Sequence, residues 1–252
     1  MCFPFDAIVP ELPERFQVIA GGAAGERLTL TSADGTDFSA YLARAEGATG
    51  VVVLPDVRGL FRFYEQLAER FAAAGHPAIA IDYFGRTAGL GPRDEDFEFR
   101  PHIQQSTPEN VARDVEAALN TLRAETGAER AITVGFCFGG AQSFMQAAEG
   151  HTGLAGVVGF YGSLVRDGQR WALDRAPDAK VPVLGLFAGA DENITPDQVA
   201  AFDAALPVEH LVHTYEGAPH SFFDRRQEQY AEASQDAWER ILGFISNFEA
   251  KV

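Results

Sequence analysis

AITVGFCFGGAQSF, residues 131–144, runs from a strand pattern through glycines into a helix pattern. Residues 131–134 are apolar and rich in β-branched side chains, glycines follow at once, and a helix-forming stretch comes next. Cys137 therefore lies on a turn from a strand to a helix, where it is either a packing residue or a nucleophile. Gly135 and Gly139 favour the nucleophile, because side chains at these positions would clash in so sharp a turn.

The glycine spacing argues against other uses of this turn. A dinucleotide-binding loop needs Gly-x-Gly-x-x-Gly, whereas the glycines here stand at 135, 139 and 140, and no Lys-Ser or Lys-Thr follows them as in a phosphate-binding loop. Redox chemistry would need a resolving partner for the thiol, and the only other cysteine, Cys2, is far away near the N-terminus. The start of a helix does, however, suit a thiolate, because the helix dipole and backbone N–H groups stabilise it.

Short apolar strand patterns alternate with helical patterns along the chain. Strands are predicted near 27–32, 37–43, 50–54, 77–82, 130–135, 154–160, 181–187 and 210–216. Longer helices are predicted over 62–74, from Ser106 to about 125, from Thr195 onward, and over about 228–248. This alternation predicts an α/β fold with a mostly parallel central sheet of about seven to eight strands, flanked by helices on both faces.

The length of 252 residues, 46% of them hydrophobic, predicts a single domain spanning residues 1–252. Residues 1–25 form an N-terminal extension before the first strand. The longest irregular segment, residues 83–105, is expected either to cover the active site, as long loops often do, or to be a surface excursion carrying the acidic cluster 94–96.

Charge and cysteine content narrow the class of protein. The net charge of −16 disfavours nucleic acid and anionic membranes as partners, and it repels anionic substrates at long range. Two cysteines form neither a disulfide framework nor a zinc motif, so no metal is expected. No signal peptide or apolar stretch of membrane-spanning length is present in the sequence. We expect a cytoplasmic protein, either a monomer or a small homo-oligomer.

A nucleophile on such a turn needs a base, and the base needs an orienting acid, each placed after a later strand. Asp191 follows the strand pattern VPVLGLFAG, with Glu192 as an adjacent competitor. His220 follows HLVHTYEG and is the one histidine that completes the chain order nucleophile, acid, histidine at a loop after a strand. The histidines that do not fit this order are His76, His102, His151, His210 and His213.

Acyl transfer also needs backbone donors for the oxyanion, normally the N–H after the nucleophile and one from a loop after an early strand. Phe138 provides the first of these donors. The strand pattern GVVVLPDVRG makes Val57 the natural second, and its neighbour Asp56 is either a turn former or a functional residue.

Taken together, these residues resemble the dienelactone hydrolase family of the α/β-hydrolase fold. The resemblance is carried by the motif from Gly135 to Gly140, the segment AIDYFGR, the Asp191 loop and the turn GAPHSF, and it extends from about residue 25 to 247. It is specific, because most α/β-hydrolases use serine as the nucleophile.

The resemblance implies roles for individual residues. Cys137 is the nucleophile, His220 the base and Asp191 its orienting acid, while Val57 and Phe138 donate to the oxyanion. The substrate is expected to contact Asp56, Arg86, Phe136, Ser221, Phe222 and Arg225. Arg86 corresponds to the family arginine that binds a substrate carboxylate, and Asp56 stands where relatives have a glutamate that contacts the resting thiol. A second family arginine is replaced by Asp224, with Arg225 and Arg226 directly after it.

The expected function is therefore that of a cofactor-free, cysteine-dependent hydrolase of lactones or carboxylic esters, working through an acyl-enzyme. One alternative is a promiscuous esterase or thioesterase for neutral apolar esters, since one of the two carboxylate-binding arginines is replaced. The other is a ligand-binding member of the fold without activity, because a fold alone does not prove a function.

Overall fold

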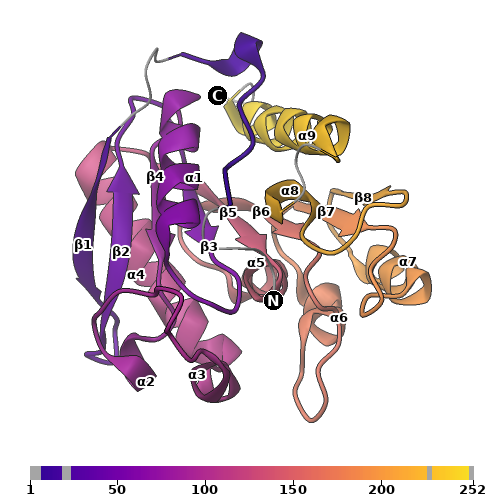
Figure 1. The fold of residues 1–252 in the computed structure, drawn as a ribbon, viewed down its shortest axis with the longest axis horizontal. Coiled ribbons are helices and arrows are strands. Elements are labelled where there is room, and N and C mark those ends of the chain that lie inside the picture. The colour runs from indigo at the N-terminus through magenta and orange to yellow at the C-terminus, as the bar shows by residue number, and fades with distance from the viewer. Residues whose placement is uncertain (1–6, 19–23, 226–228, 250–252) are drawn as a thin grey trace.

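The computed structural model describes residues 7–18, 24–225 and 229–249, apart from the side chains of residues 224 and 225. These residues form one eight-stranded sheet with helices on both sides (Figure 1). The strands are β1 (Gly25–Thr31), β2 (Asp37–Ala43), β3 (Thr49–Leu54), β4 (Ala78–Ile81), β5 (Arg130–Phe136), β6 (Leu154–Phe160), β7 (Val183–Ala188) and β8 (His210–Tyr215).

The sheet order is β1-β2-β4-β3-β5-β6-β7-β8, and every pairing from β4 to β8 is parallel. Only β2 runs against its neighbours β1 and β4. The predicted fold class is thus confirmed, and each predicted strand lies within two residues of its observed bounds. β3, β4 and β7 are buried along their whole length, as expected for strands covered on both faces.

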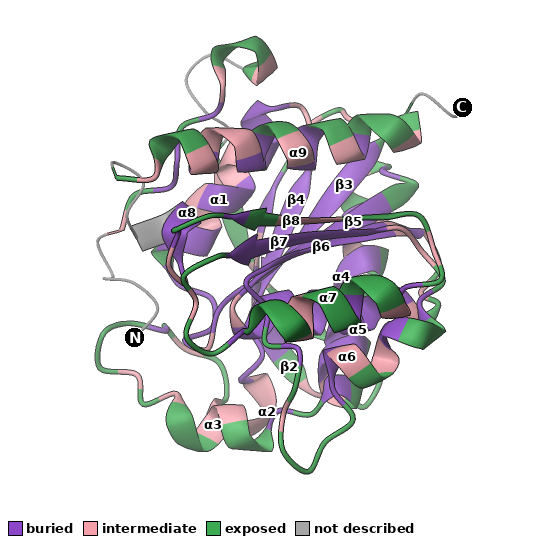
Figure 2. Ribbon diagram, turned by 90° about the vertical axis from the view of Figure 1, so that its right-hand side faces the viewer, coloured by how far each residue is buried: buried purple, intermediate pink, exposed green. Residues whose placement is uncertain are grey.

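Two groups of helices cover the sheet (Figure 2). One face carries α1 (Arg62–Ala73), α8 (Phe222–Arg225) and α9 (Ala231–Glu249), and the other carries α4 (Pro108–Thr126), α5 (Phe138–Glu149), α6 (Ala172–Arg175) and α7 (Pro196–Ala205). The predicted start of α7 is confirmed, because Thr195 accepts a hydrogen bond from the N–H of Gln198. The cap of α4 is Thr107, one residue after the predicted Ser106, and it accepts from the N–H of Asn110. The described chain also contains two short 3₁₀ helices, Glu14–Phe16 and Ala176–Asp178.

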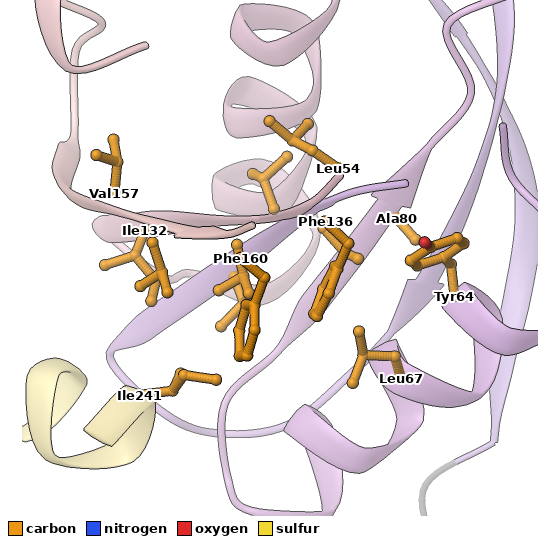
Figure 3. Packing of buried hydrophobic residues seen from close by; sticks show 14 of the residues in the cluster. Leu54, Tyr64, Leu67, Ala80, Ile132, Phe136, Val157, Phe160 and Ile241 are labelled. Carbon is orange, nitrogen blue, oxygen red and sulfur yellow. The ribbon is translucent and has the colours of Figure 1, made fainter. Parts of the chain in front are cut away.

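The centre of the core lies around β5 and β6. Phe136 stacks on Phe160 with 4.7 Å between ring centroids, and the ring of Tyr64 from α1 lies 5.9 Å from Phe136 (Figure 3). Ile241 of α9 closes the same cluster from the other helix of this face. This packing fixes where β5 ends in the sheet, and therefore the position of Cys137, which follows β5 directly.

Residues 7–18 pack against α1 and α9. Val9 and Leu12 are buried, and Trp238 donates its indole hydrogen to the Pro10 carbonyl oxygen at 3.2 Å. Gln235 binds the carbonyl oxygen of Glu11 in the same way. The described part of the predicted N-terminal extension therefore contributes to the core.

The segment 83–105 contains two short helices, α2 (Gly85–Ala88) and α3 (Arg100–Gln105), that the sequence did not predict. Its anchor is a buried ion pair between Arg93 and Asp82, with Nη2 and Oδ2 2.9 Å apart. Asp82 also accepts hydrogen bonds from the N–H groups of Leu60 and Phe84. The start of this segment is thus fixed to the end of β4.

Within the described chain, no helix combines the length and the apolar content needed to cross a bilayer.

Candidate active site

Cys137 occupies a strained turn between β5 and α5. Its backbone angles are φ 56° and ψ −113°, in a region that residues other than glycine rarely adopt. A Cβ on Gly135 would overlap the main chain of Gly139, and one on Gly140 would overlap the carbonyl oxygen of Phe160, both closer than 3.0 Å. The glycines are therefore required by close main-chain packing, as the sequence pattern predicted.

His220 and Asp191 come together at the ends of neighbouring strands. Asp191 lies three residues after β7 and His220 five residues after β8. His220 Nδ1 and Asp191 Oδ2 are 2.6 Å apart, and the side chain of Asp191 is fully buried. Burial acts to raise the pKa of Asp191, but the hydrogen bond and charge of His220, with the N–H groups of Asn193 and Ile194, outweigh it, so the pKa is lowered. Asp191 is thus an ionised hydrogen-bond partner of the His220 imidazole.

A cavity of about 340 Å³ joins these groups at the carboxyl edge of the parallel strands. It is lined by Val57, Ile103, Cys137, Phe138, Tyr161, Ser163, Arg166, Trp171, Asn193, Ile194 and His220. The thiol, the imidazole and the two residues predicted to bind an oxyanion therefore share one space. Most of its walls are apolar.

The loop that carries Val57 is held by two tyrosines. Tyr83 donates its hydroxyl hydrogen to the carbonyl oxygen of Pro55 at 2.8 Å, and Tyr64 accepts from the N–H of Asp56 at 3.0 Å. These two contacts satisfy both polar groups of one peptide unit, directly before Val57. Phe138 is the first residue of α5, where N–H groups have no partner within the helix. The geometry thus places both predicted donors on rigidly held backbone.

Asp56 is fully buried beside Arg58. Its carboxylate accepts from the N–H of Arg58 at 2.9 Å, and its Oδ2 lies 3.0 Å from Nη2 of the same arginine. The guanidinium of Arg58 lies over the ring of Phe61 at 4.5 Å. Asp56 therefore has an ion-pair partner of its own and is not among the residues that line the cavity.

The structure does not bring Arg86 to the cavity. Its guanidinium lies between Asp114, at 2.6 Å, and Asp34, at 2.9 Å, and its side chain is 13% exposed. Both carboxylates come from segments remote in sequence, so Arg86 connects α4 to the turn between β1 and β2. In this structure its contacts are those of a structural ion-pair network rather than of a substrate-binding residue.

Four further residues predicted to touch the substrate are placed elsewhere or lie outside the described part. Phe136 and Phe222 are fully buried in the aromatic core and do not line the cavity. Ser221 follows His220 with φ 63°, and its buried hydroxyl has no hydrogen-bond partner among the described residues. The side chain of Arg225 lies outside the described part of the structure, as do those of Asp224 and Arg226.

Several lining residues were missed by sequence reasoning. Tyr161 directly follows β6, and its ring centroid lies 4.9 Å from that of His220. The position of Tyr161 at the end of a parallel strand was a usable signal, because strand ends meet at this edge. Ser163, Arg166 and Trp171 come from the loop before α6, where no periodicity marks them. Ile103 of α3 brings part of the segment 83–105 to the cavity.

No group of three or more metal-ligating side chains occurs among the described residues.

A sheet of this order, with a strained cysteine turn after β5 and an acid and a histidine after later strands, defines the protein as an α/β-hydrolase. The family model described as "Dienelactone hydrolase family" matches residues 38–249. The chain therefore belongs to the dienelactone hydrolase family, and it is a carboxylic ester hydrolase.

Individual relatives agree with this assignment. Carboxymethylenebutenolidase from Pseudomonas putida is 28% identical over 237 residues, which cover 90% of this chain and 98% of the relative. A Methylorubrum extorquens protein named "Putative carboxymethylenebutenolidase" is 31% identical over 247 residues, 91% of this chain and 83% of its own. The crystal structure of a "Putative Dienelactone Hydrolase" from Klebsiella pneumoniae has a TM-score of 0.76 and 27% identity, over 88% of this chain and 99% of the other.

Proposed function

We propose that this protein hydrolyses a lactone or carboxylic ester through an acyl-enzyme on Cys137, with His220 as base and Asp191 as its orienting acid. The observation that carries the proposal is the short hydrogen bond between His220 Nδ1 and Asp191 Oδ2, 2.6 Å long, beside a cavity that His220 and Cys137 both line. The bond leaves Nε2 of His220 as the nitrogen available for proton transfer on the cavity side.

In the first half of the reaction, His220 takes the proton of the Cys137 thiol, the resulting thiolate attacks the carbonyl carbon, and the carbonyl oxygen becomes an oxyanion. The N–H groups of Val57 and Phe138 would stabilise that charge. The carbon–oxygen bond of the ester then breaks, and His220 gives its proton to the alkoxide. In a lactone the new hydroxyl stays on the acyl chain.

In the second half, water attacks the thioester carbonyl carbon while His220 takes a proton from it. The carbon–sulfur bond breaks and Cys137 returns as a thiolate. Throughout both halves, the carboxylate of Asp191 stabilises the positive charge that His220 gains. No cofactor takes part in this scheme.

Neutral esters with small apolar acyl groups are a second substrate candidate. The apolar walls formed by Ile103, Phe138, Tyr161, Trp171 and Ile194 support this candidate, because burying each methylene of such a group contributes about 0.8 kcal/mol. A binding protein without activity is the weaker alternative, since binding alone gives no reason for a strained cysteine turn and a histidine held by a buried aspartate.

Substitution of Cys137 by alanine tests the proposal. We expect kcat/KM for 4-nitrophenyl acetate to fall by about three orders of magnitude or more, because nucleophile and base act as one unit. Intact-mass spectrometry of acid-quenched wild-type protein should show an acetyl adduct that maps to Cys137.

Cys2→Ala is the matched control, since it removes the other thiol of the chain. It should leave both activity and adduct unchanged. Wild-type turnover by Cys137→Ala, or an adduct on another residue, would contradict the proposed mechanism.

A further inference from the structure

Arg166 brings a positive charge to the cavity that holds Cys137 and His220. It belongs to the loop between β6 and α6, and it lines the same 340 Å³ space. The residue is half-buried, and most of its neighbours in the cavity wall are apolar. A guanidinium keeps its charge at any pH compatible with folding, so a site of this kind requires a counter-charge or water to offset the cost of desolvation.

The described residues provide no carboxylate within ion-pair distance of Arg166. Its contacts are the Ile103 carbonyl oxygen, 3.4 Å from Nη2, and the ring of Trp171, whose centroid lies 4.9 Å from Cζ. Burial accordingly lowers the pKa of the guanidinium from its ordinary value. Arg86 and Arg93, which are also largely buried, differ from Arg166 because each of them forms an ion pair with a buried aspartate.

Trp171 adds a second donor on the same wall. Its side chain is 2% exposed and lines the cavity, and its indole N–H has no acceptor in the described structure. The contact with the guanidinium also restricts the rotation of Arg166, which prepares its planar donors for a two-point contact. A guanidinium without a carboxylate partner and an indole N–H without an acceptor therefore line the cavity that Cys137 and His220 also line.

We propose that Arg166, assisted by the indole N–H of Trp171, binds a carboxylate carried by the ester or lactone substrate. This inference rests on the proposed function and adds a specificity determinant to it. Arg86 cannot fill that role while Asp34 and Asp114 neutralise it, and the net charge of −16 makes a local cation necessary for holding an anionic substrate.

A pair of substrates separates this role from catalysis: mono-4-nitrophenyl succinate, which carries a free carboxylate, and its neutral methyl ester. For Arg166→Gln we expect kcat/KM for the acid to fall about 10- to 100-fold, the range for a charged hydrogen bond, and that for the neutral ester to stay within about threefold. Arg166→Lys should keep part of the acid activity, because it preserves the charge but loses the planar fork.

Arg170→Gln is the matched control. It removes the same charge from the same loop, at a side chain that is 63% exposed and paired with Asp178. It should leave the ratio of the two kcat/KM values unchanged. A second variant, Trp171→Phe, keeps the ring under Arg166 and removes only the N–H, and it should lower the acid activity selectively by about threefold to tenfold.

The outcomes are distinct. A selective loss on the acid in Arg166→Gln supports the inference. An equal loss on both substrates, no loss on either, or the same ratio change in Arg170→Gln overturns it. If the wild-type protein hydrolyses neither substrate, the proposed function itself fails.

Discussion

Gly139→Ala tests whether the two sides of the expected oxyanion site must touch through their main chains. A Cβ at this position would lie closer than 3.0 Å to the carbonyl oxygens of Leu54 and Pro55. Both are main-chain atoms that no rotamer change can move, so the start of α5 and the end of β3 would have to separate by about 1 Å. Phe138 immediately precedes Gly139, and Val57 follows two residues after Pro55. The separation therefore widens the gap between the two donors.

The size of the effect follows from this displacement. A misplacement of about 1 Å in a reacting site costs about 100-fold in rate, and removal of one oxyanion donor costs about 100- to 1,000-fold. We expect kcat for 4-nitrophenyl acetate to fall about 100-fold, with a smaller change in KM. The same overpacking should lower the free energy of unfolding by about 1–3 kcal/mol. Alkylation of Cys137 by iodoacetamide needs no oxyanion site, so its rate should stay within about threefold of wild type.

Stopped-flow kinetics, urea unfolding and alkylation rates measure these three quantities. Gly243→Ala is the matched control, because a Cβ there meets no atom within 4 Å on the exposed side of α9. It should raise the free energy of unfolding by about 0.5–1 kcal/mol and leave kcat unchanged. If folded Gly139→Ala retains wild-type kcat and stability, the contact between these two sides does not define the site.

Two further predictions concern the anchors around the cavity. Tyr83→Phe removes the hydrogen-bond donor to the buried Pro55 carbonyl oxygen. It should therefore lower the free energy of unfolding by about 1–3 kcal/mol and lower kcat about tenfold. The control Tyr41→Phe loses a hydrogen bond to Glu69 far from the cavity and should leave kcat unchanged. Arg93→Met leaves buried Asp82 unpaired and should cost about 3–5 kcal/mol at pH 7. Burial already raises the pKa of Asp82 despite Arg93, and losing Arg93 raises it further. An aspartate with a raised folded-state pKa destabilises the fold as pH increases. Urea unfolding of Arg93→Met should therefore show that part of the lost free energy of unfolding is recovered near pH 4–5. A loss that does not change with pH would contradict this.

The sheet could be predicted from the sequence because its strands are local apolar runs. Burial on both faces gives β3 and β7 a nearly continuous hydrophobic signal, which ends where glycine or proline follows. The short helices α2 and α3 lacked such a signal. Their segment is ordered by the pairing of Arg93 with Asp82, eleven residues apart, and no period reveals an ion pair of this kind.

The candidate site residues also differ in whether a local sequence signal or a distant residue sets their position. Cys137, Asp191 and His220 each lie within five residues of the end of a strand, so the position of each strand end largely fixes the position of the residue. Arg86 has a long side chain whose direction depends on Asp34 and Asp114, far away in the sequence. A motif match could identify the arginine but could not show which carboxylates surround it.

The distribution of backbone strain suggests why substrate recognition and chemistry are separable in this protein. The three residues other than glycine with positive φ in the described chain are Cys137, Tyr161 and Ser221, and all three adjoin the cavity or His220. Each such conformation costs about 1–3 kcal/mol and persists only where surrounding packing determines it, which the glycine contacts and the aromatic core provide here. Arg166 and Trp171, in contrast, lie on a loop that no strand end positions. We therefore expect substitutions in that loop to change which ester is accepted, while the strained residues proposed to perform the reaction stay in place.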